Sequence, residues 1–213
     1  MLQNFLPALK GHLLDRFLST RTSQETTGST TDTRPGYILL QHDRLYRHNI
    51  MRINYTTYDV RRAQDVINPN TSHCNVMILN EKGSSPYAYA KVLGVYHINA
   101  FYAGHNGLSE CRPRRMEFLW VRWYHNVEVE SGWNARKLDR VSFLPVGHPD
   151  SFGFVDPSQV LRGCHMIPVF SRGKVHPDCN GLSRIARDAL DWKQYYVNRY
   201  FPASFTVAIT NGL

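Results

Sequence analysis

The chain has 213 residues, of which 42% are hydrophobic and 12% aromatic, so it can bury the core of one domain with extensions. Its formal net charge is +8 at pH 7 and its pI about 9.5, which suits a polyanionic partner such as DNA, RNA or an acidic protein surface. Four cysteines without a CxxC pair argue against a disulfide scaffold, and the lack of a signal-peptide pattern and of a membrane-length apolar segment predicts an intracellular protein with no membrane contact.

Residues 1–18 form the first predicted element, an amphipathic helix. Its apolar side chains recur every three or four residues, at Leu2, Phe5, Leu6, Leu9, Leu13, Phe17 and Leu18. A lone helix of this length is marginal in water, so this Leu2–Leu18 stripe must pack either on its own domain or on another chain. Residues 19–35 are rich in Ser and Thr and nearly free of apolar side chains, which predicts a flexible linker.

Residues 36–173 hold the predicted β module. Aromatic and β-branched side chains, with Gly, Pro, Asn or charge in the gaps, predict strands at 37–40, 48–58, 75–79, 87–101, 116–125, 137–144 and 164–170. Gly94 lies inside the longest stretch and indicates a bend or bulge. Apolar side chains on both faces of 116–125 indicate a central strand. Together these strands predict a small, bent antiparallel barrel of the SH3 type.

The segments that follow predict short helical structure. A helical turn is expected within 155–163, with Asp156 as its cap. Residues 174–213 are expected to hold a loop, a C-terminal helix over 183–200 and a tail at 201–213 that is either frayed or one more strand. The predicted fold class is therefore mainly β, α+β overall, with the barrel flanked by N- and C-terminal helices.

Catalytic motifs are missing from the sequence. It contains no GxSxG elbow, no phosphate-binding glycine loop and no cysteine in a nucleophile context, so we expect no enzyme, no catalytic residue and no cofactor. Cys164, His165, His176 and Cys179 are residue types that zinc accepts, but adjacent Cys164 and His165 point to opposite faces of a strand. We therefore expect no metal site.

Binding chemistry is better represented. Aromatic side chains crowd the β module, and the candidates for ligand contact are Tyr89, Trp123, Tyr124 and Trp133. Such rings can box a methylated ammonium by cation–π attraction or stack on bases, although core packing is the competing interpretation. Arg112, Arg114 and Arg115 precede or begin the central strand and are the candidates for phosphate contact.

Several strings resemble a large family of uncharacterised proteins of basidiomycete fungi that are associated with transposable elements. They are YTTYDVRRAQDVINPNTSHCNVMIL, PYAYAKVLGVYHINA, RRMEFLWVRWYH, GWNARKLDRVSF, FGFVDPSQVLRGCHMIPVF and DWKQYYVNRY, together with the helix LPALKGHLLDRFL. In larger members this region follows a transposase-like portion, so the resemblance implies an accessory module. The family's usual acidic, Gly-rich ending is replaced here by FPASFTVAITNGL.

The strings YAYAKVLGVYH, FLWVRWYHN and GCHMIPV also resemble strands of BAH (bromo-adjacent homology) domains, which are β-barrel readers of chromatin. That resemblance implies nucleosome or histone-tail binding and a nuclear location. The sequence thus favours a non-enzymatic interaction module of transposable-element origin that binds chromatin or nucleic acid, with DNA, RNA or histone tails as partners. The alternative is a structural adaptor that docks a partner protein through the Leu2–Leu18 helix.

Overall fold

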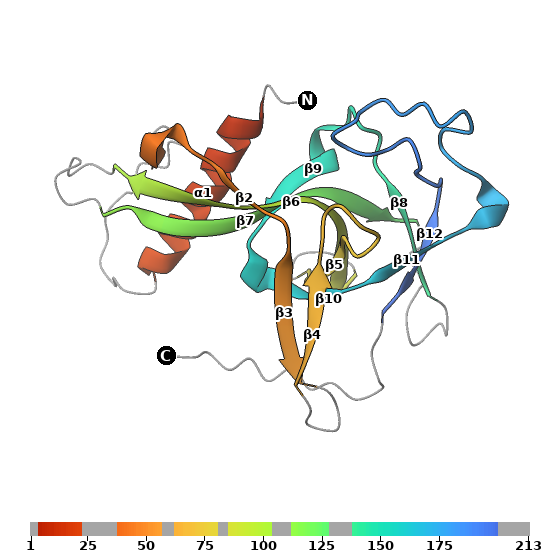
Figure 1. Ribbon diagram of the computed structural model, residues 1–213, viewed down its shortest axis with the longest axis horizontal. Helices are drawn as coiled ribbons and strands as arrows, with labels where there is room; N and C mark the ends of the chain where they lie inside the picture. Colours follow the sequence, from red (N-terminus) through yellow and green to blue (C-terminus); the bar gives the residue numbers. More distant parts are fainter. Residues whose placement is uncertain are drawn as a thin grey trace.

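The computed structural model describes residues 4–22, 38–56, 62–80, 85–103, 112–127 and 138–199 (Figure 1). The helix and strands, in chain order, are α1 (Phe5–Thr22), β1 (Ile38–Leu40), β2 (Tyr46–His48), β3 (Met51–Thr56), β4 (Arg62–Ile67), β5 (Asn75–Leu79), β6 (Tyr87–Tyr102), β7 (Arg114–Asn126), β8 (Asp139–Phe143), β9 (Phe152–Val155), β10 (Val160–Gly163), β11 (His165–Pro168) and β12 (Tyr195–Asn198). Short 3₁₀ turns are η3 (Gln41–Asp43), η5 (Pro149–Ser151), η6 (Pro157–Gln159) and η7 (Phe170–Arg172). The fold is mainly β, and the predicted N-terminal helix is confirmed, since α1 starts at Phe5 and continues to Thr22.

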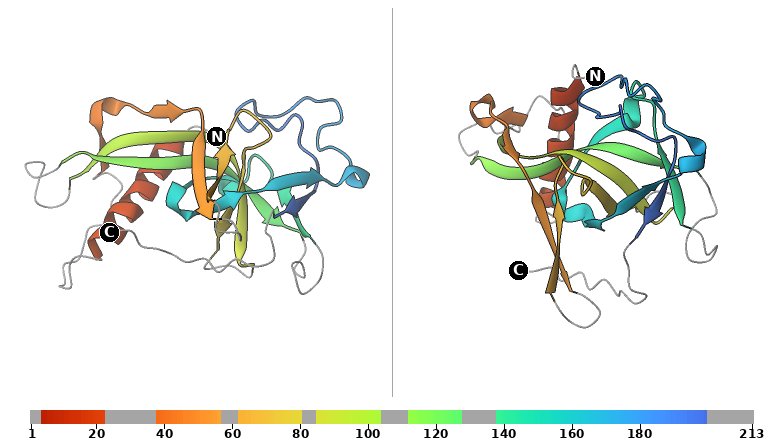
Figure 2. Two further views of the ribbon diagram at one scale, coloured as in Figure 1. Left: turned by 60° about the horizontal axis from the view of Figure 1, so that its bottom comes forward. Right: turned by 45° about the vertical axis from the view of Figure 1, so that its right-hand side comes forward.

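Ten strands form one antiparallel sheet that is organised around the long pair β6–β7. Its hydrogen-bonded order is β10-β5-β6-β7-β8-β12-β11, while β1 and β2 also pair with β6, and β9 also pairs with β7. Strands β3 and β4 form a separate two-stranded hairpin, whose far end stands away from the sheet in Figures 1 and 2. The strand predicted over 116–125 is central, as its two apolar faces indicated.

The sheet bends strongly but is not closed into a barrel, so the predicted barrel is wrong. Strands β10 and β11 stand at the two ends of the ladder and pair with β5 and β12, not with each other, although they flank Cys164 in the chain. The predicted bulge at Gly94 is confirmed, because the β6–β7 register shifts between Val92 and Gly94. A Cβ atom at Gly94 would lie 2.3 Å from the Tyr96 ring, so a larger residue here would displace that ring.

Helix α1 packs on one face of the outer half of β6 and β7 (Figure 2, left). Leu9, Leu13 and Leu14 are almost completely buried there. Burial of three leucines stabilises the docked helix by about 6 kcal/mol, which undocking would lose. The Leu2–Leu18 stripe, where the structure describes it, is therefore used inside the chain, with Leu6 left 47% exposed. This packing weakens the alternative in which the stripe docks a partner protein.

The predicted C-terminal helix over 183–200 is wrong. Turns occupy 177–192, and Tyr195–Asn198 is strand β12, which pairs with β8 and β11. Two aspartates account for the difference. Asp188 accepts the N–H groups of Leu182 and Ser183 at 2.9 and 3.0 Å, and Asp191 forms an ion pair with Arg122 of β7. These contacts hold the segment in turns despite its helical spacing of apolar side chains.

The predicted turn within 155–163 is confirmed as η6, where the Asp156 carboxylate accepts the Ser158 N–H at 2.9 Å. Most of the predicted linker, residues 23–35, lies outside the described residues, as do Trp133 and the tail at 201–213.

We predict that stability falls in mild acid because of His12 on α1. Burial, followed by the nearby charge of Arg16, lowers the pKa of His12 from 6.5 to about 4. Above pH 6.5 the ring is neutral in the folded and unfolded chain. Between pH 6.5 and 4 only the unfolded chain gains the proton, so the free energy of unfolding should fall with pH, by about 3 kcal/mol at most.

Urea denaturation at a series of pH values will measure this effect. The variant His12→Gln should flatten the profile over that range, whereas the exposed-site control His165→Gln should keep the wild-type profile. Parallel profiles for wild type and His12→Gln would contradict the assignment.

Candidate nucleic-acid interface

The three arginines predicted to contact phosphate lie at the outer end of β7, and all three are exposed. Strand alternation sends Arg114 and Arg115 to opposite faces. The Arg114 guanidinium lies 5.8 Å from the centre of the Phe17 ring of α1, and Arg115 forms an ion pair with Glu117 at 3.0 Å on the other face. Arg112 precedes the strand. The sequence therefore located three exposed cations. Two of them, Arg114 and Arg115, point to opposite faces of the sheet and do not form one patch.

The predicted aromatic residues lie elsewhere. Trp123 and Tyr124 are at the opposite end of β7, and nine residues of strand separate Tyr124 from Arg115, a distance of roughly 30 Å. The structure thus does not bring these rings and the arginines into one site. Trp123 is half-buried and packs against the core between β5, β6 and β9, with its indole against Gly153.

Tyr89 and Tyr124 are structural. The Tyr89 side chain is 1% exposed, and its hydroxyl donates to Asp139 and accepts from Arg199, both at 2.5 Å. The Tyr124 hydroxyl donates to Asn75 Oδ1 at 3.0 Å, and its ring stacks on Phe143 at 4.1 Å. Burial raises the pKa of both phenols. Tyr89 is therefore closed to a ligand, which corrects that expectation. Tyr124 is partly buried, and Phe143 covers one face of its ring.

Aspartates are drawn inward to pair with cations from distant segments. Asp191 is 3% exposed and contacts Arg122 and Lys91, the latter at 3.4 Å. Burial raises the pKa of Asp191, and the two cations act against that rise. The other such pairs are Asp139 with Arg199, Asp65 with Arg162, and Asp156 with Arg16. These carboxylates contribute little negative charge to the surface.

The exposed part of the described chain is basic, as the composition indicates. Among the described residues, ten exposed Lys and Arg side chains face five exposed Asp and Glu side chains. The basic ones are Arg44, Arg47, Arg52, Arg62, Arg112, Arg114, Arg115, Arg172, Arg184 and Lys193; the acidic ones are Asp15, Asp43, Glu117, Asp150 and Asp178. An excess of exposed cations raises the local concentration of anions near a protein surface.

A group of three rings on β2 and β6 lies on the face of the sheet opposite α1. We call it the ring stack, Tyr46, His48 and His97. Tyr46 and His97 are nearly parallel, with centroids 4.7 Å apart, and His48 Nε2 lies 2.6 Å from His97 Nδ1. Burial, then Arg115 and His48, lower the pKa of His97. The sequence analysis missed this group, although alternation of Tyr46 and His48 within one strand was a usable signal.

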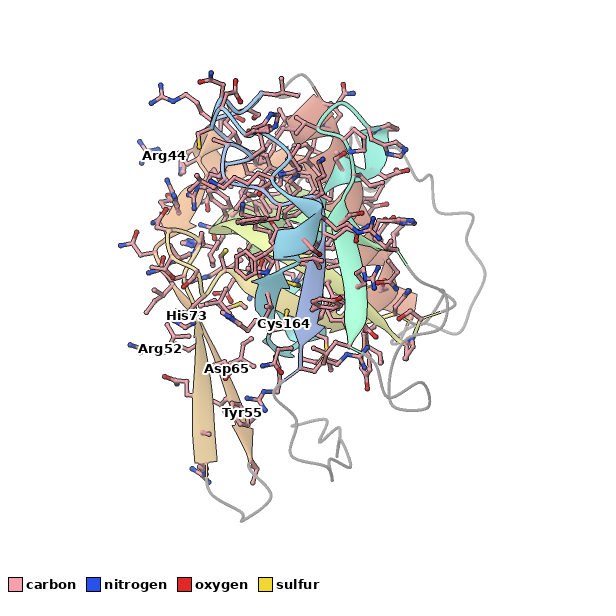
Figure 3. The ribbon with its side chains drawn as sticks, turned by 90° about the vertical axis from the view of Figure 1, so that its right-hand side faces the viewer. Arg44, Arg52, Tyr55, Asp65, His73 and Cys164 are labelled. Carbon is pink, nitrogen blue, oxygen red and sulfur yellow. The ribbon has the colours of Figure 1, made fainter. Side chains whose placement is uncertain are left out.

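The β3–β4 hairpin presents a second exposed polar face. Its inward side chains are apolar or paired, whereas its outward side chains are polar apart from Val66: Arg52, Asn54, Thr56, Arg62 and Gln64. Figure 3 shows Arg44, His73 and Arg52 projecting from one side of the molecule, with Tyr55 and Asp65 on the other side of the hairpin. This outward face therefore carries two arginines, two amide side chains and one hydroxyl.

Comparisons with protein-family models, with curated proteins and with solved structures found no match to this chain. Among the residues that the structure describes, no group of three or more His, Cys, Asp or Glu side chains is placed to hold a metal ion. The described helix α1 falls short of the length and apolarity that a membrane-crossing helix needs.

We predict that Asp191→Ala destabilises the fold strongly. The change leaves the Arg122 guanidinium buried without its carboxylate, and breaking one side of a buried ion pair costs about 3–5 kcal/mol. Chemical denaturation will measure the free energy of unfolding. The exposed control Asp150→Ala should change it by less than about 0.5 kcal/mol. An equally small effect for Asp191→Ala would show that the pair does not stabilise the fold.

Proposed function

We propose that this protein is a non-enzymatic module that binds nucleic acid through the phosphate backbone. The observation that carries the proposal is the basic surface of the described residues, on which exposed Lys and Arg outnumber exposed Asp and Glu by two to one. Phosphate contacts supply most non-specific affinity for nucleic acid and need exposed Arg and Lys rather than a deep pocket. A half-exposed ring such as Tyr46, 38% exposed, adds a surface on which a base can stack.

The proposal also covers the protein's origin in a transposable element and its binding to chromatin. The resemblance to transposon-associated fungal proteins supports an accessory role in or beside such an element, and a nuclear location. The strings that resemble BAH domains lie on β6, β7 and β11. A relationship to the BAH fold is part of this proposal. Because Tyr89 is buried and the Tyr124 ring is stacked on Phe143, contact with DNA is favoured over a histone-tail cage as the route to chromatin.

We expect the arginines of the outer end of the sheet to dominate binding. The variant Arg44→Ala/Arg47→Ala/Arg112→Ala removes three exposed cations near η3, β2 and the start of β7. Each lost phosphate contact lowers the slope of log affinity against log salt by about 0.9, so three should lower it by about 2–3. Fluorescence anisotropy with a labelled duplex at several salt concentrations will measure the slope.

The control variant Arg172→Ala/Arg184→Ala/Lys193→Ala makes the same change in net charge on the 170–193 segment, at the other end of the molecule in Figure 1. It should change the slope by less than about 1. Equal effects of the two variants would assign binding to net charge alone, and salt-independent binding would exclude a phosphate-based function.

A further inference from the structure

The structure points to a use for the β3–β4 hairpin that rests on the proposed function: we infer that its outward face reads base edges in the major groove of duplex DNA. The residues involved are Arg52, Asn54, Thr56, Arg62 and Gln64, which we call the reading face. All five are exposed. The inference concerns sequence preference, whereas the phosphate contacts above concern affinity.

The shape of the hairpin fits this groove. The strands pair over six residues each, from Met51↔Ile67 to Thr56↔Arg62, without an interruption in register. A two-stranded β ribbon fits the B-form major groove, which is about 12 Å wide. The deep, narrow major groove of A-form RNA does not admit such a ribbon. Since the ribbon stands away from the sheet (Figure 1), its far end can enter a groove before the body meets the backbone.

The chemistry of the reading face matches base edges. Gln64 Nε2 donates to Asn54 Oδ1 at 2.8 Å, which leaves the Asn54 amide N–H donors and the Gln64 carbonyl oxygen facing outward as a donor and an acceptor. Adenine offers the complementary N7 acceptor and N6 donor in the major groove. Arg52 and Arg62 are the residue type that bonds to guanine O6 and N7. The face therefore suits adenine flanked by guanine.

The inward face of the hairpin is fixed to the body. Asp65 accepts from Arg162 Nε at 3.1 Å, from Arg162 Nη2 at 3.3 Å and from the Gly163 N–H at 3.1 Å. The Arg162 guanidinium also lies 3.7 Å from the centre of the Tyr55 ring. These contacts pair Asp65, the acidic side chain of β3 and β4 as described, and hold the two strands in one orientation. A rigid reading face loses less entropy on binding than a mobile loop would.

The flanks of the hairpin carry further cations. Arg44 projects from the same side of the molecule as Arg52 (Figure 3), as does His73. Cations beside an inserted ribbon meet the phosphates that border the groove, which fixes register while the ribbon reads bases. The reading face and its flanks thus combine two kinds of contact that sequence-specific DNA recognition uses.

Selection from a random duplex library with the wild-type protein, followed by anisotropy on the selected and a scrambled duplex, tests the inference. We expect a clear preference for the selected duplex. Asn54→Ala and Gln64→Ala should each reduce that preference by roughly 5- to 150-fold while leaving affinity for the scrambled duplex nearly unchanged. The control Gln159→Ala, on exposed η6, should keep the wild-type preference.

Two further measurements keep the test independent of folding. Substitution of purines by their 7-deaza analogues removes the N7 acceptor, and should weaken binding of wild-type protein to the selected duplex. A duplex RNA of the same sequence should bind no better than the scrambled DNA.

The outcomes separate this inference from the proposed function. Salt-dependent binding without any sequence preference would overturn the reading face and leave the phosphate-binding function intact. A preference that survives both Asn54→Ala and Gln64→Ala, or stronger binding to duplex RNA, would also overturn it. Absence of binding to any nucleic acid would remove the proposed function itself.

Discussion

The pairing of β6 with β7 is the constraint on which the rest of the structure depends. It runs from Ala90↔Trp123 to Ala100↔Arg114, and the other strands of the main sheet are all hydrogen-bonded to this pair, either directly or through neighbouring strands. The bulge at Gly94 divides the pair into two halves. One half carries α1 on one face and the ring stack on the other, and the other half curls into the core that β8, β11 and β12 complete. The bend therefore creates two environments within one continuous pair of strands.

Ion pairs inside the protein join segments that are far apart in sequence. Asp191 of the 183–194 segment meets Arg122 of β7, and Asp139 of β8 meets Arg199. Such a pair must stay intact, because removal of one partner leaves the other charge buried and uncompensated. Each pair withdraws one acid and one cation from the surface, so these pairs leave the balance of surface charge unchanged. The basic surface of the described residues follows from the surplus of Lys and Arg in the sequence, and the proposed function uses that surplus.

The sequence predicted those features that depend on local pattern. Side-chain alternation located most of the sheet strands, the turn at Asp156 and the bulge at Gly94, since each depends on neighbouring residues. The predicted barrel was wrong, because closure would need pairing between the end strands β10 and β11, which local pattern does not determine. The predicted C-terminal helix was wrong, because the contacts of Asp188 and Asp191 hold that segment in turns. At the site, exposed arginines were predictable from charge. Tyr89 and Tyr124 were not separable from ligand-binding rings, since their polar partners, Asp139 and Asn75, lie far away in the chain.

The sequence did not indicate the β3–β4 hairpin as a binding site, because its pattern looks ordinary. Polar residues at every second position of a strand are the ordinary pattern of a solvated face, so the sequence of β3 and β4 offers no signal beyond that pattern. What distinguishes this hairpin is its attachment. The Asp65–Arg162 contact and the close fit of Gly163 against Ile67 fix its inward face, while β3 and β4 form a two-stranded sheet of their own that is not hydrogen-bonded to the main sheet. A two-stranded ribbon is marginal by itself, so this attachment is what gives the polar face a fixed orientation. The inferred role in recognition rests on that fixed orientation together with the side chains of the face.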